Sequence, residues 1–181
     1  MTNHIDLGTV LRTTLSANLY SNLITRPTGA AVRGQIELLL QPSGRSLTVI
    51  DFSHVSMIDF SCADEVIAKL LMRHGRDREA YFVFRGMTDD HWDAIETVLQ
   101  RHGLALVVER DGGMELVGVL EERELRAFQA IKRRGSAQSW ELAGDLGEPE
   151  PAVRHALDRM WHRRLIMRQG DAYMPVGELA Q

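Results

Sequence analysis

The sequence has little cysteine and no long apolar run. Cys62 is the single cysteine among 181 residues, which excludes an internal disulfide framework and any zinc site built from several cysteines. No apolar stretch approaches the roughly 20 residues that a transmembrane helix needs. The first ten residues, MTNHIDLGTV, lack the basic start and apolar core of an export signal. We therefore expect a cytoplasmic protein that does not enter a membrane.

Catalytic and cofactor motifs are absent from the sequence as well. None of the seven histidines belongs to an HExxH or similar metal-ligand pattern. The sequence contains no GxGxxG, no GxxxxGKS/T and no GxSxG, the motifs typical of dinucleotide, phosphate and acyl-transfer sites. We therefore expect a protein that is not an enzyme and that binds no cofactor and no metal.

The excess of negative charge lies in the first two-thirds of the chain. Residues 1–119 carry 11 Lys or Arg against 15 Asp or Glu, whereas residues 120–181 carry 10 of each kind. An acidic first part is a poor ligand for polyanions such as DNA. Any basic surface in the second part must therefore be local.

Residues 1–119 alternate between strand-like and helix-like patterns. The patterns predict strands at 47–52, 81–84, 104–108 and 114–120, and helices at 25–40, 61–74 and 88–103. Near the N-terminus, leucines recur at helical spacing, but an alternating pattern favours two short strands, at 5–11 and 19–25. Strands that alternate with helices pair in parallel through right-handed crossovers, so we expect one α/β domain with a central mixed sheet.

Residues 120–181 have a different pattern. It predicts helices at 121–135, 136–147 and 151–164, followed by two strands around the turn Gly170-Asp171. Three helices and a hairpin within about 60 residues are typical of a winged helix-turn-helix domain. We expect two domains, 1–119 and 120–181, joined directly without a linker.

The stretch TVIDFSHVSMIDFSCADEVI, residues 48–67, places Ser61 where a strand gives way to a helix. Ser61 followed by Asp64 fits a capping box, in which the hydroxyl accepts the N–H three residues on, a contact worth about 1 kcal/mol. The alternative is a regulatory hydroxyl at the start of a helix. Cys62, next to carboxylates, is best interpreted as a small buried residue.

The residues VIDFSHVSMIDFSCADEVIAKLL resemble the core of STAS domains, and more closely a divergent STAS-like group whose helix opens with Ser, an apolar residue and ADE. STAS domains include the bacterial anti-sigma-factor antagonists. In that branch, a partner kinase of the histidine-kinase-like ATPase fold phosphorylates the serine, and phosphorylation releases the partner. By position, the resemblance makes Ser61 the phosphoacceptor and Asp59 the acidic residue before it, with Cys62 completing the candidate partner site.

A helix N-terminus can hold a phosphate, because its N–H groups and partial positive charge attract anions. Asp64 and Glu65 oppose this, since they add negative charge in the same helical turn. Phe60 and Cys62 depart from the antagonists, which have a small residue before the serine and glycine after it.

The helix predicted at 151–164 carries a basic stripe. Its apolar residues turn inward, and its outward face and the following strand hold the candidate DNA contacts Arg154, His155, Arg159, His162, Arg163, Arg164 and Arg168. Such a face is suited to contact with phosphates and base edges.

Residues 124–176 resemble winged-helix bacterial regulators over nearly their full length. The third helix of those regulators normally starts with Ser or Thr, which bonds a DNA phosphate, whereas this chain has Glu148-Pro149-Glu150-Pro151. The alternatives to DNA binding are a solvated charged face and a winged helix that contacts proteins. We expect Trp140 to pack in the core or against the first domain.

Two hypotheses combine these features. The first is a bacterial transcription regulator, a homodimer in which the winged helix binds DNA and the STAS-like domain senses a protein partner or a phosphorylation state. Two chains would then read half-sites about one helical turn apart. The second is a partner-switching protein without DNA affinity, in which both domains contact proteins and Ser61 is the switch.

Overall fold

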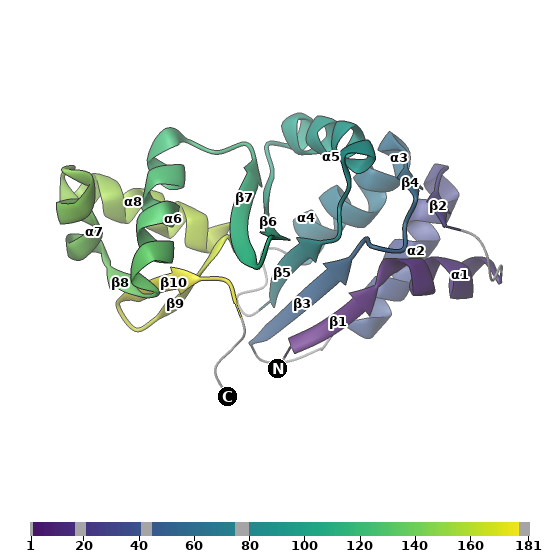
Figure 1. The fold of residues 1–181 in the computed structure, drawn as a ribbon, viewed down its shortest axis with the longest axis horizontal. Helices are drawn as coiled ribbons and strands as arrows, with labels where there is room; N and C mark the ends of the chain where they lie inside the picture. The colour runs from purple at the N-terminus through teal and green to yellow at the C-terminus, as the bar shows by residue number, and fades with distance from the viewer. Residues whose placement is uncertain (1, 17–20, 41–44, 75–79, 178–181) are drawn as a thin grey trace.

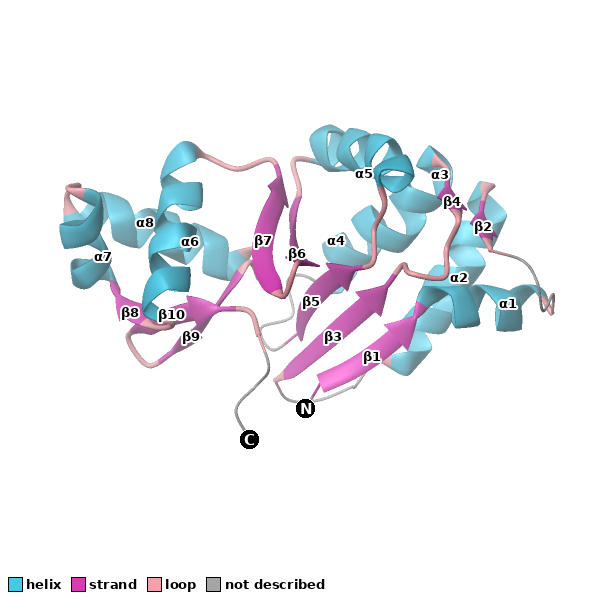
Figure 2. Cartoon of the chain, viewed as in Figure 1, coloured by secondary structure: helices cyan, strands magenta, loops and turns pink. Residues whose placement is uncertain are grey.

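The structure, a computed structural model, describes residues 2–16, 21–40, 45–74 and 80–177. These residues form a mixed α/β fold with a five-stranded sheet, a three-stranded sheet and a short two-stranded pair (Figure 1). Figure 2 shows that helices and strands alternate along the first part of the chain, whereas helices and a small sheet make up the second. The predicted α/β class is confirmed.

The central sheet contains five strands in the order β1-β3-β5-β6-β7. Their bounds are β1 Thr2–Asp6, β3 Ser46–Asp51, β5 Ala80–Arg85, β6 Ala105–Arg110 and β7 Gly113–Gly118. The first four strands are parallel, and β7 returns antiparallel to β6. The strands predicted at 47–52, 81–84, 104–108 and 114–120 are confirmed, with small shifts at their ends.

The helices that connect the parallel strands lie on one face of the sheet (Figure 1). They are α1 Leu7–Leu15, α2 Arg26–Leu39, the continuous segment of α3 Phe60–Ala63, η1 Asp64–Lys69 and α4 Leu70–His74, and α5 Asp89–His102. The parallel strands follow each other across the sheet in chain order, so right-handed crossovers place every connecting helix on the same side. The apolar side chains on the opposite face of the sheet must be buried by another part of the molecule.

The N-terminal segment is a short strand and a helix, and the prediction of a strand at 5–11 is wrong. The strand ends at Asp6, whose carboxylate accepts the N–H of Gly8 at 3.0 Å and caps α1. The competing leucine spacing is the true signal, because as a helix the segment buries Leu7 and Leu11 against the sheet.

The strand predicted at 19–25 is reduced to β2, Asn22–Leu23. It pairs in parallel with an equally short strand, β4 Met57–Ile58. The beginning of the predicted strand, residues 19–20, lies outside the described residues.

Residues 120–177, the C-terminal unit, contain helices and a small antiparallel sheet. The elements are α6 Glu122–Arg134, β8 Ala137–Gln138, α7 Ser139–Leu146, α8 Glu150–His162, β9 Ile166–Gln169 and β10 Ala172–Pro175. The strand order is β8-β10-β9, and β9 and β10 flank the predicted turn at Gly170-Asp171. The three predicted helices and the hairpin are confirmed as secondary structure.

Apolar side chains on the two faces of the central sheet belong to two clusters. Successive residues of a strand point to opposite faces, so β3 contributes Ile50 to one cluster and Val49 to the other. The first cluster packs against α1–α5. The second cluster joins strand residues to residues of the C-terminal unit, among them Leu47, Val49, Tyr81, Val83, Val107, Phe128, Ile131, Leu157 and Leu165.

The C-terminal unit therefore covers the part of the open face that β3, β5 and β6 form, whereas His4 on β1 stays exposed. Parallel strands are normally buried on both faces, and this unit supplies the second cover. Arg45 Nη2 also donates to the carbonyl of Arg168 at 3.0 Å, which ties the start of β3 to β9. The domain boundary at 119/120 stays a prediction, and one hydrophobic cluster extends across it.

Candidate functional site

The helical segment that contains Ser61 is capped by Asp59. Asp59 Oδ1 accepts the N–H of Cys62 at 2.8 Å, and Ser61 Oγ donates to the same oxygen at 2.8 Å. The predicted capping box, in which Ser61 caps the N–H of Asp64, is therefore wrong. The helix starts earlier than expected because Asp59 is an equally good cap and its negative charge is favoured at a helix N-terminus.

Asp59 also joins two segments that are far apart in the sequence. Its Oδ2 accepts the N–H of Thr25 at 2.9 Å, immediately before α2. Thr25 has a φ of +71°, which a β-branched residue rarely adopts, so this contact helps to hold an unfavourable backbone conformation. Burial alone would raise the pKa of Asp59, but the hydrogen bonds from the Thr25 and Cys62 amides outweigh burial and hold the pKa below its ordinary value.

The two residues after Phe60 differ in accessibility, since Ser61 is partly exposed and Cys62 is fully buried. The Cys62 thiol donates to the carbonyl of Thr25 at 3.0 Å. Burial, together with the negative charge of Asp59, raises the pKa of Cys62 to about 12. The interpretation of Cys62 as a small buried residue is confirmed, and a thiol that stays protonated is a poor nucleophile.

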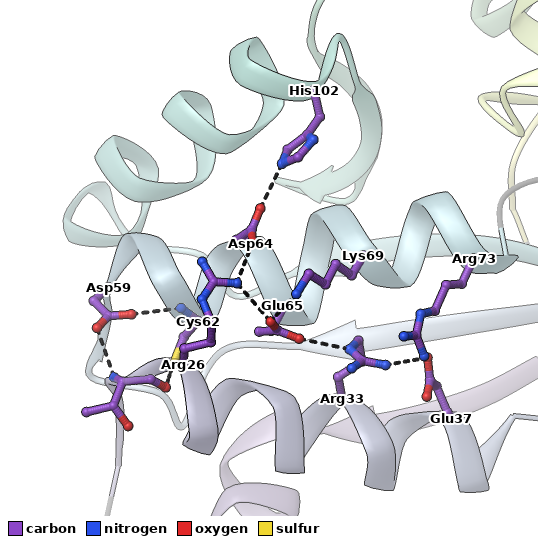
Figure 3. Close-up of polar contacts among 11 residues, drawn as sticks. Arg26, Arg33, Glu37, Asp59, Cys62, Asp64, Glu65, Lys69, Arg73 and His102 are labelled. Atoms are coloured by element: carbon purple, nitrogen blue, oxygen red, sulfur yellow. Dashed lines mark hydrogen bonds and ion pairs between the residues drawn. The ribbon is translucent and has the colours of Figure 1, made fainter.

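Charged side chains fill the contact between α2 and the α3–η1–α4 segment (Figure 3). Glu65 lies at the centre with 2% of its side chain exposed, and it contacts Arg26 at 2.8 Å, Arg33 at 3.2 Å and Lys69. Arg33 also contacts Glu37 at 3.0 Å, one helical turn further along α2. Three cations around one buried carboxylate compensate the loss of its hydration.

Asp64 extends this cluster to a third helix. Its carboxylate contacts Arg26 at 2.7 Å and the Nε2 of His102, at the end of α5, at 2.7 Å. Burial would raise the pKa of Asp64, but hydrogen bonds from Arg26 and His102 hold it below its ordinary value. The negative charge that would oppose a phosphate near Ser61 is therefore matched by cations from neighbouring helices.

The close approach of α2 depends on a glycine. A Cβ on Gly29 would lie 2.9 Å from the Cα of Cys62, so a side chain there would push the two helices apart. Opposite α2, the helix adopts the π form at η1, a distortion that occurs often at functional sites. Near this close approach, Arg26 contacts both Asp64 and Glu65.

Two of the candidate DNA contacts, Arg159 on α8 and Arg163 directly after it, point to α6 instead. Arg159 contacts Glu124 at 3.0 Å and Glu121 at 2.5 Å. Arg163 lies 3.4 Å from Glu124 and donates to the carbonyl of Val119 at 2.6 Å. Glu124 is fully buried, and removing both cations would leave an uncompensated charge in the protein interior. Arg159 and Arg163 therefore hold α8 against α6.

The other arginines of the predicted stripe are also engaged within the molecule. Arg154 contacts Glu150, one turn earlier on α8, at 2.6 Å. Arg164 is 6% exposed, donates to the carbonyl of Trp161 at 2.6 Å and lies 6.0 Å from the centre of the Tyr81 ring. Arg164 lies two residues beyond the end of α8, and its burial keeps it out of any exposed basic face.

Arg168, on β9, is surrounded by the hairpin and by α8. It donates to the carbonyl of Gly170 at 2.9 Å and lies 3.8 Å from Asp158 and 3.7 Å from Asp171. Its guanidinium also lies 5.4 Å from the centre of the Trp161 ring. Its charge is therefore partly compensated by two carboxylates.

The two histidines of the stripe are accessible to solvent, as is Arg154. His155 and His162 are both exposed. The Nδ1 of His162 lies 2.6 Å from the carbonyl of Asp158, so this nitrogen carries the hydrogen. The exposed face of α8 is consequently less cationic than its sequence indicates.

The acidic residues before α8 have structural partners. Glu148 contacts Arg126 at 2.7 Å and also contacts Arg123, which links this loop to α6. Glu150 accepts the hydroxyl of Ser139 at 2.6 Å, where α7 begins. Trp140, in contrast, does not pack as expected: it is 64% exposed and its ring N–H donates to Gln138 at 2.8 Å.

Sequence reasoning missed most of the cluster around Glu65. The pairs Arg33–Glu37 and Glu65–Lys69 have the i,i+4 spacing that supports helices, and this spacing is readable from the sequence. The contacts of Arg26 and His102 are not readable, because they depend on how three helices pack against each other.

Within the described residues, no group of three or more His, Cys, Asp or Glu side chains is placed to hold a metal ion. Among the same residues, none of the helices combines the length and the apolar character needed to cross a membrane. No protein-family model matches the sequence, and a search of curated proteins finds no match.

Proposed function

We propose that this chain is a regulatory protein that binds a protein partner at the start of α3, with Ser61 as the hydroxyl that switches the contact. The observation that carries the proposal is the position of Ser61. Its partly exposed hydroxyl lies 2.8 Å from Asp59, the residue that joins the beginning of α2 to the beginning of α3. A chemical change at Ser61 acts directly on that junction.

Phosphorylation is the change that fits the resemblance to anti-sigma-factor antagonists. A kinase of the histidine-kinase-like ATPase class binds ATP as the phosphoryl donor. The Ser61 oxygen forms a bond to the γ-phosphorus, the bond from that phosphorus to the bridging oxygen breaks, ADP leaves, and the hydroxyl proton passes to a base. The product adds about −1.5 to −2 charge at pH 7 next to the carboxylate of Asp59. The two anions repel each other, so Asp59 leaves the Thr25 amide and the surface at the start of α3 changes.

The surface beside Ser61 has the composition of a protein contact. Met57 is 54% exposed, and Phe60 is partly exposed, with the guanidinium of Arg101 5.3 Å from its ring centre. Methionine, aromatic residues and arginine are enriched in protein interfaces. A partner that covers these side chains also covers Ser61.

The first experiment is to incubate the full-length protein with ATP and a lysate of its host and to locate phosphate by mass spectrometry. Ser53 provides a matched control, because its exposed hydroxyl also donates to an aspartate two residues earlier, Asp51, at 2.6 Å. We expect phosphate on Ser61 and not on Ser53, and its loss in Ser61→Ala but not in Ser53→Ala.

Partner binding is tested with the phosphorylated and unphosphorylated proteins side by side. Cross-linking from a photoreactive residue at Met57 should capture the kinase when the protein is unphosphorylated. It should not capture the kinase when the protein is phosphorylated beforehand. Equal capture in both states, or an absence of phosphate on Ser61, would leave Ser61 with a structural role only.

DNA binding is the second candidate function. The order α6-β8-α7-α8-β9-β10 is that of winged-helix domains, and Arg154, His155 and His162 are exposed on α8. Against it, every arginine of the predicted stripe donates to a carboxylate or a carbonyl of the chain itself. Phosphate contacts supply most of the affinity for DNA, so arginines that are already engaged weaken this reading.

The test of DNA binding is enrichment of sheared host DNA on full-length protein at about 150 mM salt, where non-specific contacts are screened. We expect no enriched locus. Enrichment of loci that share an inverted repeat, lost in Arg154→Ala, would establish a DNA-binding homodimer and overturn this ranking of the two functions.

A further inference from the structure

Ser61 lies on the helix face that Arg26 crosses. Asp64 and Glu65 follow Ser61 by three and four residues, the spacing at which helical side chains share a face. Helical side chains lean toward the N-terminus, so these two carboxylates extend over the turn that contains Ser61. Arg26 Nη1 contacts Asp64 at 2.7 Å and Glu65 at 2.8 Å (Figure 3). The guanidinium of Arg26 therefore lies over the same turn.

Arg26 has donors left for a second anion. Its Nη1 makes both contacts with the carboxylates, and among the described residues its Nη2 and Nε donate to no other group. The side chain is 48% exposed, so an anion on the surface can reach it without entering the interior. The planar fork of a guanidinium matches the oxygens of a phosphate, which favours a bond to more than one of them.

A second arginine approaches Ser61 from α5. Arg101 is exposed, and its guanidinium lies 5.3 Å from the ring centre of Phe60, the residue directly before Ser61. Within the part of the chain that the structure describes, Arg101 forms no ion pair with a carboxylate. Its charge is therefore available to an anion attached to Ser61.

We propose that Arg26 and Arg101 together hold the phosphate on Ser61, the first from α2 and the second from α5. This inference rests on the proposed function, since it describes where the phosphate goes once it has been added. When Arg26 shares its donors with the phosphate, Asp64 keeps its contact with His102 at 2.7 Å, so this carboxylate is not left without a partner.

The movement of Arg101 gives a physical reason for release of the partner. A cation–π contact at an exposed site is weaker than a charge-assisted hydrogen bond to a phosphate, so Arg101 leaves the ring of Phe60. Phe60 and Arg101 belong to the surface beside Met57 that we propose as the partner contact. The phosphate therefore changes that surface through Arg101 as well as through Asp59.

The test uses full-length protein that carries phosphoserine at position 61, inserted during synthesis with an expanded genetic code, so that no kinase is needed. Phosphorus NMR measures the second pKa of the phosphate, which is about 6 in an unperturbed phosphoserine. Cations beside the phosphate favour its doubly charged form and lower this pKa. We expect Arg26→Gln and Arg101→Gln each to raise the second pKa by at least about 0.5.

Arg133→Gln is the matched control. Arg133 is an exposed arginine on α6, which lies far from α3 in Figure 1, so the substitution removes the same charge at a distance from Ser61. Because salt screens such a distant charge, the second pKa should change by less than about 0.2.

The side-chain Nε–H signals of Arg26 and Arg101 provide a second readout that needs no substitution. Both signals should shift as the phosphate titrates, and they should shift less over the same pH range in the unphosphorylated protein. If Arg26→Gln does not fold, the signal of Arg26 decides, because the same pH dependence with and without phosphate contradicts the contact.

The proposal is overturned if either Arg26→Gln or Arg101→Gln raises the second pKa no more than Arg133→Gln does. The phosphate would then be held by solvent alone. Neither a kinase nor a partner enters this experiment, so failure here and failure of the proposed function are distinguishable.

Discussion

Both parts of the molecule contain a buried glutamate that arginines contact. Only one of these glutamates contacts arginines that belong to a face predicted from the sequence to bind a ligand. Glu65 is contacted from α2 and from its own helix, and its cations come from a face that has no binding role predicted from the sequence. Glu124 is contacted by Arg159 and Arg163, two residues that would otherwise be candidates for DNA contact. A count of basic residues along a helix therefore overstates the charge available to a ligand when a buried carboxylate lies on the next helix.

The two parts also differ in how they depend on each other. The central sheet has helices on one face only, and the β3, β5 and β6 residues of its second face pack with residues of the C-terminal unit. We expect residues 1–119 alone to expose Leu47, Tyr81, Val83 and Val107, each of which contributes about 1.5–3 kcal/mol when buried. Light scattering of the purified fragment should show association, and a stable monomer would contradict the shared core.

The second prediction separates the two buried glutamates. The double variant Arg159→Met and Arg163→Met removes both cations that contact Glu124 among the described residues and should lower the free energy of unfolding by about 3 kcal/mol or more. Arg26→Met should cost clearly less, because Arg33 and Lys69 remain beside Glu65. Urea unfolding of both proteins measures the difference. An equal loss of unfolding free energy in the two variants would contradict the expected difference between the Glu124 and Glu65 clusters.

The third prediction concerns the close approach of α2 to the helix that carries Ser61. Gly29→Ala should lower the free energy of unfolding by about 1–3 kcal/mol, since the new methyl group meets the backbone of Cys62. Gly34→Ala, on the same helix with no atom near the new Cβ, should raise stability by about 0.5–1 kcal/mol. The opposite order of the two melting temperatures would contradict the described packing of α2.

The fourth prediction is a pH effect confined to the first part of the chain. His91 is fully buried, its Nε2 lies 3.0 Å from the carbonyl of Val55, and burial lowers its pKa below the ordinary value. The unfolded chain therefore takes up a proton first as the pH falls below about 6.5, and stability decreases there by at most about 1.4 kcal/mol per pH unit.

His91→Gln keeps a side-chain acceptor for the Thr88 amide and removes this titration. The free energy of unfolding, measured between pH 7 and pH 5, should change less with pH in the variant than in the natural protein. His155→Gln, the same substitution at an exposed position on α8, is the control. If the free energy of unfolding changes equally with pH in all three proteins, His91 does not contribute to the pH dependence of stability.

Much of the fold is predictable from the sequence because its signals are local. The strand at 47–52 is a nearly continuous apolar run, and the helix at 88–103 ends at a glycine, Gly103, with a φ of +63°. The first segment is misread because five residues of strand and nine of helix are too short for periodicity to separate them.

The candidate site is less predictable, for a physical reason. The sequence identifies both Asp59 and Ser61, but which of them caps the helix depends on where the helix starts. Asp59 also accepts the N–H of Thr25, which lies 34 residues earlier in the chain. The partners of Arg159 and Arg163 likewise follow from the packing of α8 on α6. Charge pairs between helices are set by the rotation of one helix against another, which a single sequence does not encode locally.

The one-sided winding of the sheet also has a consequence for synthesis on the ribosome. The strands of the sheet emerge first, and the cover for their second face, residues 120–177, follows later. At about 5–20 residues per second, the apolar face waits roughly 3–12 s for the remaining chain. During that interval the apolar residues of that face lack their cover, and slow translation of the last third would lengthen the exposure.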